Sequence, residues 1–208
     1  GYGAYKKTKG LLNKIIRFDT FHTALQYLSF ALAGHPYMGV GRNLAYKRQV
    51  FFRQKGFASH HHLPGGDDDL FINAVANKHN TAVVIDKEAF TYSTPKKSWS
   101  EWIAQKERHQ TTGKYYKAKD RVLLGAYVIT HLLFYPVTVI AFFFLPWMWI
   151  LPALLCKLIL QSVVFYNAMS KLNEKDLFPY FIFWDLWMIV YYLYFMSSLW
   201  KKPKTQWS

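Results

Sequence analysis

The C-terminal part of the chain consists of apolar runs with very few charged positions. Residues 122–145 contain no Asp, Glu, Lys or Arg over 24 positions. At about 1.5 Å per helical residue, such a run is long enough to cross a hydrocarbon core of about 30 Å. Residues 146–170 and 178–200 are also apolar, with one charge each, Lys157 and Asp185. The pattern predicts a C-terminal bundle of two to three transmembrane helices.

The two isolated charges have more than one interpretation. Charged side chains inside a membrane are costly and usually face the interior of the helix bundle, so Lys157 and Asp185 are candidates for an ion pair. Alternatively, Lys157 extends its ammonium group to the membrane surface, or its segment lies in the interface. Three crossings would place the basic tail, residues 201–208, opposite residues 1–121. Two crossings and one interfacial segment would keep both basic parts on one side, as the positive-inside tendency favours.

Residues 1–121 precede this block and contain shorter patterns. Between residues 20 and 32 apolar side chains recur at helical spacing, which predicts an amphipathic helix. Such a helix either packs in a protein core or lies on the bilayer surface. Hydrophobic patterning also predicts short strands at 40–47 and 81–85, and helices at 67–78 and 99–111.

Charge is concentrated in the same N-terminal part. Residues 1–121 hold 20 Lys and Arg against nine Asp and Glu, a net charge of +11 out of +14 for the whole chain. A basic balance indicates nucleic acid, anionic lipid headgroups or phosphorylated substrates as partners. The membrane block favours the last two, and since no nucleic-acid motif is present we expect no nucleic-acid partner. The single Cys156 excludes an intramolecular disulfide.

A run of three carboxylates, Asp67, Asp68 and Asp69, follows Gly65-Gly66. One interpretation is structural, because free N–H groups and the helix dipole stabilise negative charge at a helix start. The other is functional, because crowded carboxylates repel one another unless a cation, a proton or a hydroxyl substrate uses them. A sugar transfer that inverts the anomeric centre needs one carboxylate to take the proton from the attacking hydroxyl.

A second polar motif, Gln105-Lys-Glu-Arg108-His109, lies 36 residues after the last carboxylate. On a helix, positions i and i+3 face the same way, so Gln105 and Arg108 project together. The planar guanidinium of an arginine makes paired hydrogen bonds to a diphosphate. Taken alone, the motif is equally typical of a solvated basic helix face.

The order of the motifs resembles the C-terminal half of membrane-bound family 2 glycosyltransferases, relatives of the cellulose and hyaluronan synthases. The resemblance covers most of residues 15–121. It rests on the series Gly41-Arg42-Asn43-Leu44-Ala45-Tyr46-Lys47-Arg48, Gly56-Phe57, Gly66-Asp67-Asp68-Asp69-Leu70 and Gln105-Lys-Glu-Arg108-His109, followed by Thr112-Gly113 and an apolar run. It implies that residues 1–121 form an α/β fold, the acceptor-side half of a GT-A glycosyltransferase domain with an interfacial helix, ahead of the transmembrane helices.

The resemblance also implies roles for the acidic residues. Asp67 takes the place of the general base, three positions before Leu70. Because Gly66 replaces the first acidic residue of the family's motif, the register can slip, and Asp68 then becomes the base. Asp69 occupies the second acidic position and is expected to bind the acceptor.

For the second motif, the resemblance places Gln105 and Arg108 on the donor diphosphate. His109 replaces a Trp that lines the acceptor path in the family. His109 is expected to contact the acceptor, but it has less apolar area than a Trp for stacking on a sugar.

A divalent metal ion, Mg²⁺ or Mn²⁺, is expected as a cofactor that binds the donor diphosphate. In the family its ligands lie mainly in an N-terminal half that precedes the residues of this chain, so no metal ligand is assigned here. The rival interpretation reads Asp67 and Asp69 as a metal-binding D-x-D pair. The contiguous residues 60–62, all His, cannot converge on one ion and indicate a loop.

These features predict a membrane-bound inverting glycosyltransferase that is part of a longer enzyme. It would move a sugar from a nucleotide-sugar donor to a glycan or lipid-linked acceptor. We expect a multi-pass protein of a bacterial plasma membrane with its catalytic part on the cytoplasmic side. The alternative is a non-catalytic membrane scaffold, or assembly subunit, of a polysaccharide-synthesis system.

Overall fold

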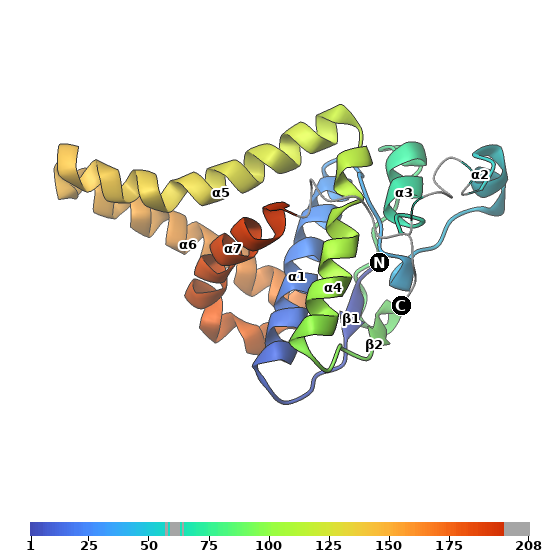
Figure 1. The fold of residues 1–208 in the computed structure, drawn as a ribbon, viewed down its shortest axis with the longest axis horizontal. Coiled ribbons are helices and arrows are strands. Elements are labelled where there is room, and N and C mark those ends of the chain that lie inside the picture. Colours follow the sequence, from blue (N-terminus) through green and yellow to red (C-terminus); the bar gives the residue numbers. More distant parts are fainter. Residues whose placement is uncertain (57, 59–62, 64, 198–208) are drawn as a thin grey trace.

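The computed structural model describes the chain apart from residues 57, 59–62, 64 and 198–208 (Figure 1). The His run at 60–62, the end of the 178–200 segment and the basic tail lie outside the described residues. The described elements follow in the order β1 (Gly3–Tyr5), α1 (Leu11–Leu32), η1 (Gly41–Asn43), α2 (Arg48–Arg53), α3 (Asp69–Val75), η2 (Lys87–Ala89), β2 (Thr91–Ser93), α4 (Trp99–Gln110), η3 (Gly113–Tyr115), α5 (Ala118–Phe144), α6 (Trp147–Lys171), η4 (Lys175–Tyr180) and α7 (Phe181–Met196).

The predicted α/β fold of a GT-A half-domain is wrong. The structure is 69% helical and is mostly a helical bundle. Within the described residues the sheet consists of β1 and β2 alone, paired in parallel with Gly3 opposite Thr91. The predicted strands at 40–47 and 81–85 are not strands, since the first contains the 3₁₀ turn η1 and the second is irregular.

The segment around η1 bonds through side chains where a strand would use its backbone. Asn43 Nδ2 donates to the carbonyl oxygens of Tyr2, at 2.9 Å, and Ala89, at 2.8 Å. Thr91 Oγ1 donates to the carbonyl oxygen of Arg42 at 2.7 Å. An extended segment becomes a strand only when a neighbouring backbone forms a ladder with it. Here side chains link η1 to both strands, and no ladder forms with any segment that the structure describes.

Within residues 1–121, helices occur in the three regions where they were predicted. The 67–78 prediction corresponds to the shorter α3, and the 99–111 prediction to α4. Ser98 and Glu101 form a capping box at the start of α4, which satisfies backbone N–H groups there. The 20–32 prediction falls within α1, which begins earlier, at Leu11, and has half of its 22 residues buried.

Helix α1 forms the centre of the molecule, packed in the core rather than on a surface. Phe18 and Phe21 are fully buried. The Phe18 ring stacks on Trp184 of α7 at 4.9 Å between centroids and also contacts Phe165 of α6. In Figure 1, α1 lies between α7 on one side and α4 on the other.

Three buried polar side chains of α1 each bond to a different element. Arg17 forms an ion pair with Glu174, between α6 and η4. Asp19 forms an ion pair with Lys106 of α4. The His22 ring is hydrogen-bonded to Tyr127 of α5 at 2.8 Å. Because a buried charge without a partner is strongly unfavourable, these contacts determine where the surrounding helices pack.

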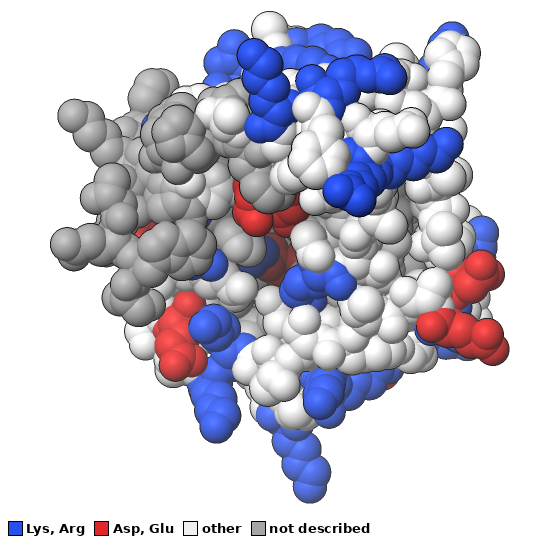
Figure 2. Space-filling view, turned by 90° about the vertical axis from the view of Figure 1, so that its right-hand side faces the viewer, with Lys and Arg blue, Asp and Glu red and all other residues white. Residues whose placement is uncertain are grey.

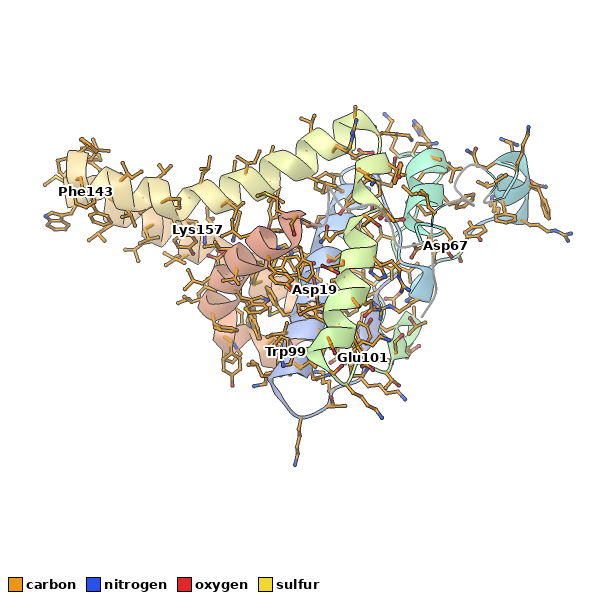
Figure 3. All side chains as sticks on the ribbon, in the orientation of Figure 1. Asp19, Asp67, Trp99, Glu101, Phe143 and Lys157 are labelled. Carbon is orange, nitrogen blue, oxygen red and sulfur yellow. The ribbon has the colours of Figure 1, made fainter. Side chains whose placement is uncertain are left out.

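Three helices are long and apolar enough to cross a membrane: Ala118–Phe144, Trp147–Lys171 and Lys175–Met196. The protein is therefore a membrane protein with transmembrane helices. Helices α5 and α6 form a hairpin that extends away from the rest of the chain (Figure 1). Its tip exposes Phe143 by 81% and Trp149 by 71%, which is the pattern of a surface covered by lipid. Figure 3 shows Phe143 at this tip, far from Asp67.

The structure contains the ion pair between Lys157 of α6 and Asp185 of α7. Asp185 is buried, and Gln161 Nε2 donates to its Oδ1 at 2.6 Å. The hydroxyl group of Tyr135 on α5 donates to Asp185 Oδ2. One carboxylate thus joins the three membrane helices through charge-assisted hydrogen bonds.

Removal of the cation should destabilise the helix bundle. Lys157→Met leaves Asp185 buried without its counter-charge, and we expect the free energy of unfolding to fall by about 3–5 kcal/mol. Titration of the purified protein with a denaturing detergent measures this change. Lys171→Met, at the exposed end of the same helix, is the matched control and should change stability little. Equal stability of the two variants would contradict the structural role of the pair.

Candidate functional site

A cavity of about 740 Å³ brings together residues from α1, α4, α5, α7 and the segment that leads into α3. Both acidic and basic side chains line it. Figure 2 shows acidic side chains inside a hollow of the surface and basic side chains around it. The charged residues that line the cavity are Asp19, Asp67, Asp68, Asp69, Arg42, Lys106, Arg108, Lys114 and Arg121.

Asp68 is the N-cap of α3. Its Oδ1 accepts a hydrogen bond from the backbone N–H of Asp69 at 2.9 Å. Its Oδ2 accepts one from the backbone N–H of Gly41 at 2.6 Å. Both oxygens therefore hold backbone groups, one at the helix start and one in the segment around η1.

Asp69 is buried and connects α3 to the residues that follow α4. Its Oδ2 accepts hydrogen bonds from Thr112 Oγ1 at 2.7 Å and from the Tyr116 hydroxyl at 2.6 Å. Its Oδ1 accepts one from the backbone N–H of Leu70 at 2.8 Å. Burial raises the pKa of Asp69, while the hydrogen bonds from Tyr116 and Thr112 act in the opposite direction.

Gly66 is required by the packing at this turn. Its φ of +93° lies in the region that favours glycine. A Cβ atom at this position would lie 2.7 Å from Leu70 Cδ1 and 3.1 Å from Thr112 Cγ2. A side chain larger than hydrogen does not fit at this position without displacing Leu70 or Thr112.

Asp67 differs from its two neighbours. It is exposed and lines the cavity. The structure shows no hydrogen bond or ion pair from its carboxylate to any of the described residues. Of the three consecutive aspartates, Asp67 is thus the one whose oxygens remain open to a molecule in the cavity.

Gln105 and Arg108 reach the same cavity from α4. Gln105 Nε2 lies 3.5 Å from the Tyr5 hydroxyl, so this side chain extends towards β1. Arg108 is exposed, and its Cγ lies 3.9 Å from the position of a Cβ atom at Gly65. Arg108 is therefore adjacent to the turn that carries Asp67.

His109 lines the cavity and is exposed to it, with the cationic side chains of Lys106, Arg108 and Arg42 in the same lining. Burial, together with the positive charges of Lys106, Arg108 and Arg42, lowers the pKa of His109 to about 3. The ring is therefore neutral near pH 7. A neutral imidazole offers one hydrogen-bond donor and one acceptor, which suits contact with sugar hydroxyl groups.

The hydrogen bonds around the acidic turn do not favour Asp67 and Asp69 as a metal-binding pair. Asp69 already accepts hydrogen bonds on both oxygens. In the part of the chain that the structure describes, no group of three or more His, Cys, Asp or Glu side chains is placed to hold a metal ion. Metal binding with the donor stays a prediction.

The sequence patterns missed several residues that shape the site. Tyr116 and Thr112 hold the acidic turn, and Arg42 lies over the Tyr5 ring at 4.2 Å while donating to the Ala4 carbonyl oxygen at 3.0 Å. These contacts join positions more than 35 residues apart, so no local spacing reports them. Arg42 and Thr112 belong to the motif series of the sequence, which does not indicate these contacts.

Comparison with protein-family models, with curated proteins and with solved structures found no match.

The low pKa of His109 predicts a contribution to acid sensitivity. The folded state keeps this ring neutral down to about pH 3, whereas the unfolded chain binds a proton near pH 6.5. Stability from this group is fully present above pH 6.5 and is lost as the pH falls from there towards 3. We expect His109→Gln to make the fall in thermal midpoint over this range less steep.

The exposed His79 offers a matched control. His79→Gln should leave the pH profile of the thermal midpoint close to that of the unaltered protein. Identical profiles for His109→Gln and His79→Gln would contradict the assigned environment of His109.

Proposed function

We propose that the protein is a membrane-bound inverting glycosyltransferase that transfers a sugar from a nucleotide-sugar donor to an acceptor hydroxyl. The observation that carries the proposal is the content of one cavity: an open carboxylate, Asp67, with Arg108, Gln105 and His109 around the same space. A base for the acceptor and a cation for the leaving group are the two features that this reaction requires.

The hydrogen bonds of the triplet support Asp67 as the base. Asp68 uses both oxygens on backbone N–H groups, and Asp69 uses both on α3 and the residues after α4. A general base needs a free oxygen within reach of the proton that it takes. These contacts favour Asp67 over Asp68, and they support a positioning role for Asp69 rather than direct contact with the acceptor.

In the proposed step, Asp67 takes the proton of the acceptor hydroxyl as its oxygen forms a bond to the anomeric carbon. The bond from that carbon to the diphosphate breaks, and the nucleoside diphosphate leaves with the electron pair. Arg108 stabilises the negative charge that develops on the diphosphate. Gln105 contributes a neutral donor, and neutral His109 orients the acceptor.

Mg²⁺ or Mn²⁺ would add charge neutralisation on the diphosphate when bound with the donor. The residues of this chain supply the base and the polar groups around it, and the proposed step does not depend on the metal.

The placement of the cavity on the cytoplasmic side is supported by four basic residues directly before or at the start of α5: Lys114, Lys117, Lys119 and Arg121. Such residues favour the cytoplasmic side of a membrane.

Replacing the base should abolish transfer while leaving the fold intact. Asp67→Asn keeps the shape of an exposed side chain but removes its proton affinity, and we expect kcat to fall about 10²–10⁴-fold with little change in donor KM. Sugar transfer by the full-length natural protein in its own membranes measures this. Asp86→Asn, exposed and outside the cavity, is the control. Full activity of Asp67→Asn would sink the assignment.

Donor binding distinguishes the proposed transferase from the alternative, a non-catalytic scaffold. Arg108→Lys keeps the charge but loses the paired hydrogen bonds, and we expect the Kd for UDP or GDP to rise about tenfold or more. Calorimetry on the full-length natural protein measures the change, with the exposed Arg53→Lys on α2 as control. If neither nucleotide binds to the unaltered protein at millimolar concentration, the scaffold interpretation takes the lead.

A further inference from the structure

The cavity continues from the acidic turn into the membrane helices. At that end it is lined by Leu124, Gly125, Val128 and Ile129 of α5, and by Tyr192 and Met196 of α7. Ile129 and Met196 are exposed by 56% and 50%. Both helices belong to segments that are long and apolar enough to cross a membrane, so this apolar end is formed by membrane helices and is continuous with the candidate site.

The lining changes character in a regular order along the chain that leads into α5. Tyr116, just before α5, is bonded to the carboxylate of Asp69. Arg121, in the first turns of α5, lines the cavity and is exposed. The apolar wall follows up to Ile129, about 12 Å further along the helix at 1.5 Å per residue. Carboxylates, a cation and an apolar wall thus succeed one another within one cavity.

Arg121 is suited to an anionic group at this position. One of its terminal nitrogens donates to the carbonyl oxygen of Lys114 at 3.4 Å, and a guanidinium has five N–H donors in total. Lys114 lines the cavity beside it. Basic side chains next to a transmembrane helix lie at the depth of lipid headgroups, where they attract phosphate.

The proposed function leaves the acceptor open between a glycan and a lipid. We infer that the acceptor hydroxyl is carried by a lipid with a phosphate in its headgroup, whose chain lies between α5 and α7 and whose phosphate contacts Arg121. This inference rests on the proposed transferase function. A free glycan would meet an apolar wall at Leu124, Val128 and Ile129 that offers its hydroxyl groups no hydrogen-bond partner.

Gly125 provides a selective way to close the lipid end of the cavity. A Cβ atom at this position would meet no atom within 4 Å, so a side chain can start here without displacing the neighbouring protein atoms, and it would extend into the cavity that Gly125 lines. Gly125→Leu would place an isobutyl group in the proposed lipid path. Ala126→Leu adds the same side chain at the next position, which is exposed and does not line the cavity. Gly125→Leu raises the helix propensity of α5 by about 1 kcal/mol and Ala126→Leu changes it little, so neither variant is expected to weaken the helix.

The test is photo-crosslinking of the full-length natural protein in phosphatidylcholine nanodiscs, with geranylgeranyl phosphate that carries a diazirine as the probe. We expect labelling of the unaltered protein and of Ala126→Leu to be equal, and labelling of Gly125→Leu to be reduced at least tenfold. Arg121→Gln should reduce labelling by the lipid phosphate but not by the corresponding alcohol, geranylgeraniol. Labelling of Gly125→Leu at the level of Ala126→Leu would overturn the inference.

Two further results separate the possible failures. If inorganic phosphate at equal concentration displaces the probe, the site binds free phosphate, and the lipid assignment is overturned. If labelling follows the expected pattern but the unaltered protein transfers no sugar from a nucleotide-sugar donor, the lipid site stands and the proposed function fails. If labelling does not follow the pattern while Asp67→Asn abolishes transfer, the transferase function stands and its acceptor is not a lipid phosphate.

Discussion

The burial of polar side chains on the central helix α1 constrains the whole arrangement. Arg17, Asp19 and His22 lie within two turns of one helix, and each bonds to a different element. The partners belong to the junction of α6 with η4, to α4 and to α5. Leaving Arg17 or Asp19 buried and unpaired would cost several kcal/mol, and leaving the neutral His22 without its hydrogen bond would also be unfavourable, so the surrounding helices are held at defined positions. In this way α1 links the membrane helices to the part that carries the cavity.

A second constraint acts on the site itself. The hydrogen bonds from Thr112 and Tyr116 to Asp69 attach the start of α3 to the end of α4. The ion pair between Asp19 and Lys106 fixes the same helix from the side of α1. Because α4 is held at both places, Arg108 lies beside the acidic turn. Asp68 and Asp69 consequently have structural roles, whereas the carboxylate of Asp67 is open to the cavity.

The continuity between this site and the membrane follows from how directly the two are joined. Tyr116 contacts the acidic turn, and α5 begins two residues later. The first turns of α5 therefore form a wall of the cavity before the helix enters the apolar zone. An acceptor anchored in the bilayer could present its headgroup to Asp67 along this wall without leaving the membrane, which would raise its local concentration at the site.

The sequence by itself determined the features that depend on neighbouring residues. The apolar runs at 122–145 and 146–170 correspond closely to α5 and α6, because a helix in lipid bonds only within its own segment. The capping box of Ser98 and Glu101 is likewise local, and α4 begins where it indicates. The acidic triplet lies at a helix start, as its free N–H groups favour.

Only the tertiary structure decided the features that depend on distant partners. Residues 40–47 and 81–85 have strand-like patterns, but among the described residues no neighbouring backbone forms a ladder with them. Of three adjacent and chemically identical carboxylates, Asp67 is open because Gly41, Thr112 and Tyr116 occupy the other two. Likewise, Lys157 pairs with Asp185 because α6 and α7 pack together. Hydrogen bonds and ion pairs of this kind are set by packing in space, which local spacing along the chain does not encode.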